Sequence, residues 1–351
     1  MQRITVMHRG KEGVHMKTER ILMAHGSGGR MSQQLIKEVF QAAWNNEIME
    51  SMLDGAVFEL KTGRLAMSTD SFVITPLFFP GGDIGKLAIC GTINDLIACG
   101  ARPVYLSTAF ILEEGLPISD LRRIARSMAE TAAESGVKLV TGDTKVVERG
   151  KGDGVYINTT GIGLIPDGVD YRPARIRPGD KIIVTGEVGD HGLAILAQRE
   201  GLSFGTPALS DCAPLIGLEG IINRYGNGIR CMRDPTRGGL ATALNEIAAQ
   251  AGQGIGVREA DIPVSPVVQG ACDMLGMDPL YMANEGKMII VAAPESAADI
   301  CSDLRRLPGM EKAAIIGSVI PEPAGMVLIE TELGAERILG ILEGEHIPRI
   351  C

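Results

Sequence analysis

Several aspartates lie in or next to apolar or structured segments, where a charged carboxylate is unusual. Asp95 lies inside the apolar segment GTINDLIACG, Asp70 ends the strand-like segment STDSF, and Asp234 precedes a helical pattern in RDPTRGG. Asp54, in LDGAVF, is a fourth candidate. A single buried carboxylate is equally well explained by a loop that it caps, although its burial is costly without a cation or hydrogen bonds. Carboxylates that converge from turns are typical of Mg²⁺ sites, because Mg²⁺ takes oxygen ligands and bridges to substrate phosphates.

Glycine-rich segments accompany these aspartates. TGDTK at 141–145 contains Asp143 and Lys145, and GGDIGK contains Asp83. Glycine lets backbone N–H groups face phosphates at turns and helix starts. Two further glycine segments, VTGEVGDHG and RDPTRGG, match neither a P-loop nor a Rossmann fingerprint. TGEVGDHG alone is compatible with a tight turn, and Lys145 alone with a surface lysine. Together, the aspartates and glycines predict an Mg²⁺-nucleotide site.

The chain ends in HIPRIC, which places a thiol on its last residue, Cys351. By itself, a terminal cysteine is best regarded as an accident. The sequence contains seven cysteines, an odd number, without a CxxC pair or a histidine cluster. This pattern fits neither a disulfide framework nor a structural zinc site, and it indicates reduced thiols in a cytoplasmic protein.

Charge and hydropathy exclude several partners. The 34 basic and 43 acidic residues give a formal net charge of −9, and no block of like charge stands out. Nonspecific binding to nucleic acid or to an anionic membrane needs clustered basic residues, so neither is expected. The sequence lacks an apolar run long enough to span a membrane. Its first 15 residues are basic but lack the apolar core of a secretion signal.

The elements that must position these residues form two α/β lobes. The segment at 85–100 is apolar nearly all round and predicts a buried helix. A second helix is expected to start at a Ser119 cap and to stop at Gly136. The segment at 165–180, with three prolines, resembles a linker between domains. From about residue 335 we expect a short helical stretch and then a tail. The remaining patterns predict strands at 56–60, 64–75, 137–144, 154–165, 287–294 and 313–320, and helices at 234–252 and 298–307. The segment at 181–201 is expected to form a strand, a turn and a helix in that order.

Six segments together resemble the HypE family of hydrogenase maturation factors, from about residue 18 to the end. They are HGSGGR (25–30), residues 68–103, TGDTKVV (141–147), residues 233–248, ANEGK (283–287) and the PRIC ending. HypE shares a superfamily with aminoimidazole ribonucleotide synthetase and selenophosphate synthetase. The resemblance implies an α/β (α+β) two-lobed PurM-like ATP-binding fold with a flexible C-terminal tail, and a homodimer formed through the first lobe. We expect a leader at 1–17, an N-terminal ATP-binding and dimerisation lobe at 18–166, a C-terminal lobe at 172–335 and a tail at 336–351.

The resemblance also implies a function for the terminal thiol. In HypE proteins, a HypF-type carbamoyltransferase places a carbamoyl group on the C-terminal cysteine. HypE then dehydrates this group to a thiocyanate with ATP. The cyanide passes to iron held by a HypC–HypD complex, on the way to a [NiFe]-hydrogenase centre.

Residue roles follow from the same resemblance. The catalytic residues are expected to be Cys351, Glu285 in ANEGK as the base, and Lys145 as a support for the transferred group. The expected metal ligands are Asp54, Asp70, Asp95 and Asp234. The expected ATP-binding residues are Asp70, Gly142, Asp143, Thr144, Lys145 and Thr236.

Two other functions stay open. Selenophosphate synthetase, an ATP-dependent phosphotransferase of the same superfamily, carries a Cys or selenocysteine and a nearby Lys in its first glycine-rich segment. This chain has Gly29 and Ser32 there, and its first cysteine is Cys90. A non-catalytic carrier whose tail only binds metal would leave the aspartates unexplained.

Overall fold

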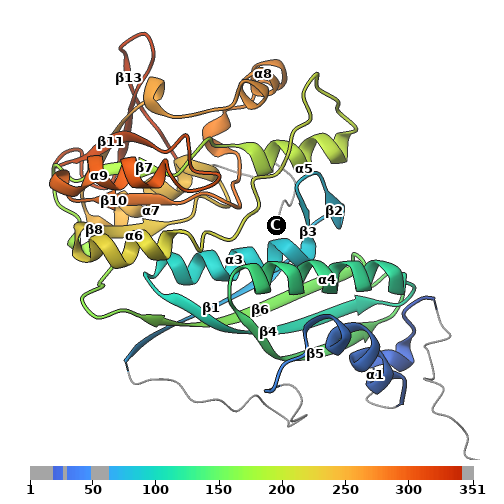
Figure 1. The fold of residues 1–351 in the computed structure, drawn as a ribbon. Coiled ribbons are helices and arrows are strands. Elements are labelled where there is room, and N and C mark those ends of the chain that lie inside the picture. Colours follow the sequence, from blue (N-terminus) through green and yellow to red (C-terminus); the bar gives the residue numbers. More distant parts are fainter. Residues whose placement is uncertain (1–18, 27–29, 49–62, 342–351) are drawn as a thin grey trace, which may run out of the picture.

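The structure is a computed structural model that describes residues 19–26, 30–48 and 63–341. Asp54, Cys351, the expected leader and the last ten residues lie outside this part. The described chain forms an N-lobe, which ends at Ile165, and a C-lobe, which begins at Lys181 (Figure 1). Within the described ranges, no helix combines the length and the apolar character that a membrane span requires.

The N-lobe is built on a four-stranded sheet with the order β1-β6-β4-β5. Neighbouring strands are antiparallel except for the parallel pair β4 and β5. The strands are β1 (Arg64–Phe72), β4 (Arg102–Glu113), β5 (Lys138–Val147) and β6 (Val155–Ile165). Helices α3 (Ile84–Ala98) and α4 (Ile118–Glu134) cover one face, and the short strands β2 (Phe78–Phe79) and β3 (Gly82–Asp83) precede α3 (Figure 1).

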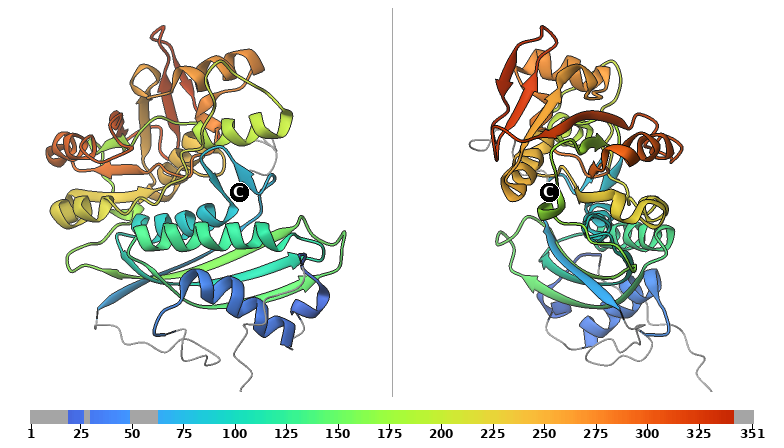
Figure 2. Two further views of the ribbon diagram at one scale, coloured as in Figure 1. Left: turned by 45° about the vertical axis from the view of Figure 1, so that its right-hand side comes forward. Right: turned by 90° about the vertical axis from the view of Figure 1, so that its left-hand side faces the viewer.

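Helix α3 is buried on nearly all sides, as its apolar sequence predicted. It lies between the N-lobe sheet and the C-lobe in every view (Figures 1 and 2). Asp83 caps its start, where the carboxylate accepts hydrogen bonds from the backbone N–H groups of Gly85 at 2.7 Å and Lys86 at 3.1 Å. Asp83 therefore has a structural role.

Helix α4 is amphipathic, as predicted, but its start differs from the expected one. It begins at Ile118 with Pro117 at the N-cap, so the expected Ser119 cap is wrong. Pro117 has an extended backbone and pairs with Arg20 in an isolated bridge, so the helix starts directly after it and Ser119 lies inside the first turn. Before the sheet, a short 3-10 helix, η1 (Met23–Gly26), leads to α1 (Arg30–Leu35), a π-helical turn (Ile36–Gln41) and α2 (Ala42–Trp44).

The C-lobe contains a seven-stranded sheet with the order β13-β12-β9-β11-β7-β10-β8. Its strands are β7 (Lys181–Val184), β8 (Ile229–Arg233), β9 (Gly254–Arg258), β10 (Ile289–Ala292), β11 (Ala314–Ile320), β12 (Val327–Glu330) and β13 (Glu336–Ile338). Its helices are α5 (Asp190–Glu200), α6 (Leu218–Tyr225), α7 (Gly239–Ala251), α8 (Pro266–Leu275) and α9 (Pro294–Leu304). The segment that joins the lobes contains only a 3-10 turn, Pro173–Arg175, as its prolines predicted.

The expected helical stretch from residue 335 is wrong. Residues Glu336–Ile338 form β13, which pairs antiparallel with β12. The exposed edge of β12 supplies backbone partners to this segment, and three residues are too few for a stable helix.

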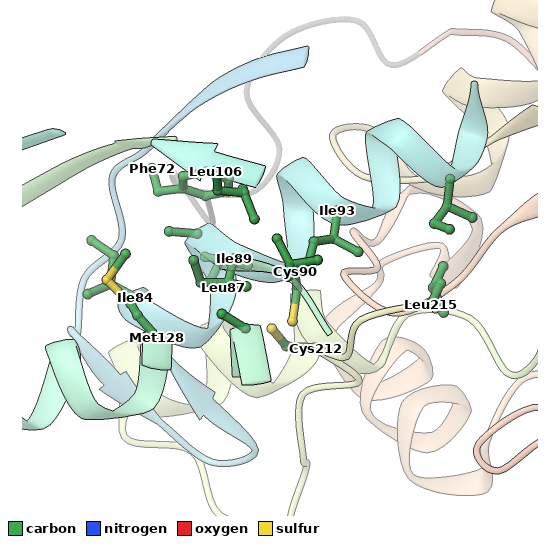
Figure 3. Close-up of a cluster of buried hydrophobic side chains, with 14 of the residues drawn as sticks. Phe72, Ile84, Leu87, Ile89, Cys90, Ile93, Leu106, Met128, Cys212 and Leu215 are labelled. Carbon is green, nitrogen blue, oxygen red and sulfur yellow. The ribbon is translucent and has the colours of Figure 1, made fainter. Parts of the chain in front are cut away.

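The two lobes share one hydrophobic core. Its largest cluster contains Phe72 and Leu87 from the N-lobe together with Leu215 and Ile290 from the C-lobe. Figure 3 shows this cluster, in which the sulfur atoms of Cys90 on α3 and Cys212 in the C-lobe point toward one another. The lobe boundary is therefore a packed apolar contact and not an open hinge.

Candidate active site

Asp95 lies on α3 at the boundary between the lobes. The Oγ atom of Ser68 on β1 donates a hydrogen bond to the Asp95 carboxylate at 2.5 Å. Burial raises the pKa of Asp95, the Ser68 hydrogen bond lowers it, and the negative charge of Asp70 raises it further. The structure therefore places Asp95 and Asp70 close enough for their charges to interact.

Asp234 follows strand β8 and completes this group. Burial, followed by the charge of Asp95 and a smaller effect of Asp70, raises the pKa of Asp234 to about 6. Burial also raises the pKa of Asp70, an effect that the Arg237 guanidinium opposes. Three of the four predicted metal ligands thus form one group, which we call the acidic cluster: Asp70, Asp95 and Asp234. Thr236 lies two residues after Asp234, just before α7.

The acidic cluster offers the oxygen ligands that suit Mg²⁺, but it is not a complete cage. In the part of the chain that the structure describes, no group of three His, Cys, Asp or Glu side chains is arranged to hold a metal ion. Mg²⁺ is commonly bound by one or two carboxylates together with substrate phosphates and water. The cluster therefore fits Mg²⁺ that arrives with a nucleotide. Burial is the main cause that raises the pKa values of Asp95 and Asp234, and repulsion between the carboxylates adds to it. A bound cation would relieve this repulsion.

Glu285 lies beside the acidic cluster, in the loop before β10. Its side chain is buried. Burial, and then the charges of Cys212, Asp234, Asp211 and Asp70, hold its pKa well above the usual range of a glutamate. A carboxylate with a raised pKa is a stronger base once it is ionised. The structure thus brings Glu285 together with the acidic cluster, as a general base next to bound phosphates would require.

The backbone at Glu285 is fixed by a residue that the sequence did not reveal. Asp211 accepts hydrogen bonds from the backbone N–H groups of Glu285 at 3.0 Å and Gly286 at 3.3 Å. A Cβ atom on Gly286 would lie 1.9 Å from the carbonyl oxygen of Asp211, so only glycine fits there. Asp211 stands in the irregular segment LSDCAPL, which has no periodicity that would have marked it.

Asn94 joins the two lobes at the same point. Its Nδ2 group donates to the carbonyl oxygens of Ala213 at 3.1 Å and Glu285 at 3.3 Å, and its Oδ1 accepts from the N–H of Leu215 at 2.8 Å. Asn94 precedes Asp95 on α3, so one helix carries a carboxylate of the cluster and the side chain that holds Glu285. The sequence signal for Asn94 is a polar amide within an otherwise apolar helix, the same kind of signal that marks Asp95.

The TGDTK segment lies at the other edge of the N-lobe sheet. Asp70, Thr159, Thr108 and Gly142 face each other across four strands in the pairing register. Three strand spacings separate the backbones of Asp70 and Gly142 by about 14 Å. Asp143 lies within strand β5, which agrees with the strand predicted at 137–144 and excludes a tight turn at TGDTK. One protomer therefore does not bring this segment to the acidic cluster.

Asp143 and Lys145 also lie on the opposite face from Asp70. A Cβ on Gly91 of α3 would lie 3.9 Å from Asp70 Oδ2, so Asp70 points toward the helices. Gly142 is in register with Asp70, so position 142 faces the helices as well. Side chains alternate between the two faces along a strand, so Asp143 and Lys145 point away from the helices. Lys145 and Asp143, both well exposed, form an ion pair at 2.8 Å.

A cavity of about 230 Å³ lies beside β5. The predicted ATP-binding residues Gly142, Asp143, Thr144 and Lys145 line it together with aromatic side chains that include Phe40 and Trp44. The predicted nucleotide residues thus fall into two groups, one at the acidic cluster and one at this cavity.

Comparisons with known proteins agree with this fold. Two models described as AIR synthase related protein match the chain, the N-terminal domain over residues 52–165 and the C-terminal domain over residues 177–346. The carbamoyl dehydratase HypE of Azotobacter vinelandii is 52% identical over 329 residues, which cover 94% of this chain and 96% of that protein. The chain belongs to the HypE family of carbamoyl dehydratases. It is therefore an enzyme of hydrogenase maturation, as the sequence predicted.

Solved HypE structures confirm the two-lobed PurM-like fold. A HypE structure in complex with ATP has a TM-score of 0.91 and 50% identity, and covers 94% of this chain and 99% of that chain. A structure of a HypE–HypF complex has a TM-score of 0.78 and 46% identity, and covers 88% of this chain and 99% of that chain.

Proposed function

We propose that this HypE protein dehydrates a carbamoyl group on its own Cys351 in an ATP-dependent reaction. A HypF-type carbamoyltransferase loads the thiol, and a HypC–HypD complex receives the cyanide for the iron of a [NiFe]-hydrogenase. The observation that carries this proposal is the buried Glu285 beside the acidic cluster. Relatives solved with ATP and with HypF support the nucleotide and the first partner. The six described cysteines are free thiols, which supports a cytosolic site of action.

The reaction balances in two steps. The carbamoyl oxygen attacks the γ-phosphoryl group of ATP, which gives ADP and an S-bound imidoyl phosphate as one N–H proton is lost. Loss of the second N–H proton then expels phosphate and leaves the S–C≡N group. Glu285 is the base that accepts a proton from nitrogen. Asp70, Asp95 and Asp234, with Asp54, would hold Mg²⁺, which supplies charge neutralisation for the phosphoryl group when bound.

The proposed domain boundaries and the β5 residues complete this assignment. We propose an N-terminal lobe at 18–166 and a C-terminal lobe that starts at 172. Because β13 pairs with β12, this lobe extends past the predicted end at 335 and includes Glu336–Ile338. The proposed flanking segments are 1–17 and the residues that follow β13. Lys145, Gly142, Asp143 and Thr144 are proposed to contact ATP. Within one protomer, three strand spacings, about 14 Å, separate these residues from the acidic cluster. For this role, ATP must therefore bind either in the cavity beside β5 or between two copies of the chain.

The intact mass of the chain tests the proposed function. The protein is incubated with a HypF-type partner, carbamoyl phosphate and ATP, and the C-terminal peptide is then sequenced by mass spectrometry. We expect the elements of HNCO to appear on Cys351 and one water then to be lost from this group. A modification on another cysteine, or none, would show that the carrier function is wrong.

Replacement of Glu285 by glutamine is expected to slow dehydration about 100-fold or more, because the amide cannot accept the proton. Binding of ATP should be retained. In the parent chain the rate should rise with pH as Glu285 loses its proton, and this rise should be absent from the variant. The measurement is the loss of water from carbamoylated chain at several pH values. Glu219→Gln is a matched control, since burial raises the pKa of Glu219 as well but Glu219 lies on α6.

We propose a homodimer through the face of the N-lobe sheet opposite to α3 and α4. On β1 this face exposes Leu65 and Met67, and the register places Ile162 next to Met67 and Leu164 next to Leu65. Exposed apolar side chains grouped on one sheet face are typical of an interface between subunits. A second copy with the same face would cover them by self-complementary packing.

Replacement of Met67 by glutamate should convert the dimer into a monomer, because the interface would then bury an unpaired charge. Sedimentation velocity at micromolar concentration measures this change. Met274→Glu on α8 is the control, since Met274 is 72% exposed and Met67 71% exposed. A parent chain that is already monomeric, or a Met67→Glu variant that stays dimeric, would contradict this interface.

A further inference from the structure

Asp211 is a buried carboxylate whose hydrogen-bond donors all come from the loop that carries Glu285. Besides the N–H groups of Glu285 and Gly286, it accepts from Lys287 Nζ at 3.1 Å. The side chains of Asp211 and Lys287 are only 4% and 8% exposed. Three consecutive residues of the loop, 285–287, are thus held by one side chain from a segment more than 70 residues earlier in the chain.

The rest of the Glu285 loop is anchored around this contact. Asn284 donates from Nδ2 to the carbonyl oxygen of Pro235 at 3.0 Å, and its Oδ1 accepts from Gly189 N–H at 2.7 Å. Pro235 follows Asp234 of the acidic cluster directly. On the other side, Asn94 binds the Glu285 carbonyl. In the described part of the chain, the Glu285 N–H donates to the carboxylate of Asp211, and hydrogen bonds to a carboxylate are roughly twice as strong as those between neutral groups.

We propose that Asp211 is a positioning residue for Glu285 in the dehydration reaction. It fixes the backbone of the base relative to the acidic cluster and so sets the approach of the carboxylate to the carbamoyl nitrogen. This inference rests on the proposed role of Glu285. A buried ion pair adds little net stability compared with apolar side chains of the same volume, so stability alone does not explain this pair. A misplacement of about 1 Å in a reacting group costs about 100-fold in rate.

The test uses full-length chain that a HypF-type partner has carbamoylated. After ATP addition, mass spectrometry follows the single-turnover loss of water at several ATP concentrations. For Asp211→Asn we expect a maximal rate 10- to 100-fold lower. The ATP concentration at half-maximal rate should be unchanged, because the acidic cluster is intact. Loss of ATP affinity in parallel with rate would overturn the proposal.

A double variant separates positioning from stability. Asp211→Leu with Lys287→Met removes both charges and keeps side chains of similar shape, so the unfolding temperature should return toward that of the parent. The backbone N–H groups of Glu285 and Gly286 still lack their acceptor, and the maximal rate should stay low. Recovery of the rate together with stability would show that Asp211 is only structural. This variant also decides the question if Asp211→Asn fails to fold.

Asp180→Asn is the matched control. Asp180 is equally buried, accepts from Arg177 N–H at 2.8 Å and faces Arg230, but it lies in the segment that joins the lobes. The Asp180→Asn variant should lose stability and keep the full rate.

Glu285→Gln separates the proposed base from the proposed positioning residue. If Glu285→Gln is fully active, the proposed base is wrong. If Glu285→Gln is inactive while Asp211→Asn is fully active, only the positioning role fails.

Discussion

Replacement of Cys351 by alanine is expected to abolish cyanide formation completely. The thiol is proposed to carry the reacting carbon through both steps, so no residual pathway remains when it is removed. Serine should fail as well, because its hydroxyl does not form the nucleophilic anion that a thiol forms near neutral pH. ATP binding should survive both changes, since the acidic cluster is formed by other segments. Mass spectrometry of the chain after loading with carbamoyl phosphate gives the result directly.

The control for this variant is Cys99→Ala. Cys99 is exposed and therefore is the described thiol most accessible to a carbamoylating partner. Its replacement should leave loading and dehydration unchanged. If Cys351→Ala still accumulates a thiocyanate while Cys99→Ala does not, the carrier would be Cys99 and the terminal thiol would be dispensable.

Replacement of Asp234 by asparagine should abolish ATP-dependent dehydration and at the same time stabilise the ligand-free protein. The activity falls because a ligand for Mg²⁺ and phosphate is lost. The stability rises because folding shifts the pKa of Asp234 from 3.8 to about 6. A shift of this size corresponds to a destabilisation of up to about 3 kcal/mol when the carboxylate is ionised.

The pH dependence of this stabilisation has a definite sign. A carboxyl with a raised pKa binds its proton more tightly in the folded state, so its ionisation opposes folding. The gain from Asp234→Asn should therefore be full above about pH 6 and should disappear as the pH falls toward 3.8. Thermal unfolding at pH 8 and pH 4 measures it. Asp299→Asn, at an exposed position of α9, should change neither stability nor activity. Loss of stability at pH 8 in the Asp234 variant would show that the carboxylate is structural.

The sequence predicted the parts of the site that break a local pattern. Asp95 is conspicuous because its neighbours on α3 are apolar, and Asp70 because it lies near the end of an alternating strand. Periodicity also predicted the burial of α3, three of the four strands of the N-lobe sheet (β1, β5 and β6) and three of the seven strands of the C-lobe sheet (β7, β10 and β11). These signals are local, since they depend only on residues within a few positions of each other.

The remaining features depend on contacts between distant segments. Asp211 holds Glu285 across more than 70 residues, and no local pattern encodes such a pairing. The placement of Lys145 depends on strand order, because a parallel β4–β5 pair moves its segment to the far edge of the sheet. The start of α4 and the β13 strand were missed because capping and edge pairing are decided by tertiary neighbours.

The apolar core common to both lobes limits how this protein can be recombined. The segment between β6 and β7 is the natural place to join halves of two homologues, because it contains little secondary structure. Such chimeras would nevertheless unite surfaces that were never selected together, among them the contact between Cys90 and Cys212. A lobe exchanged between relatives should therefore fold well only if the residues that it contacts in the other lobe are exchanged as well. The residues on the two sides of the lobe contact are thus expected to change together in evolution, although the lobes are separate segments of the sequence.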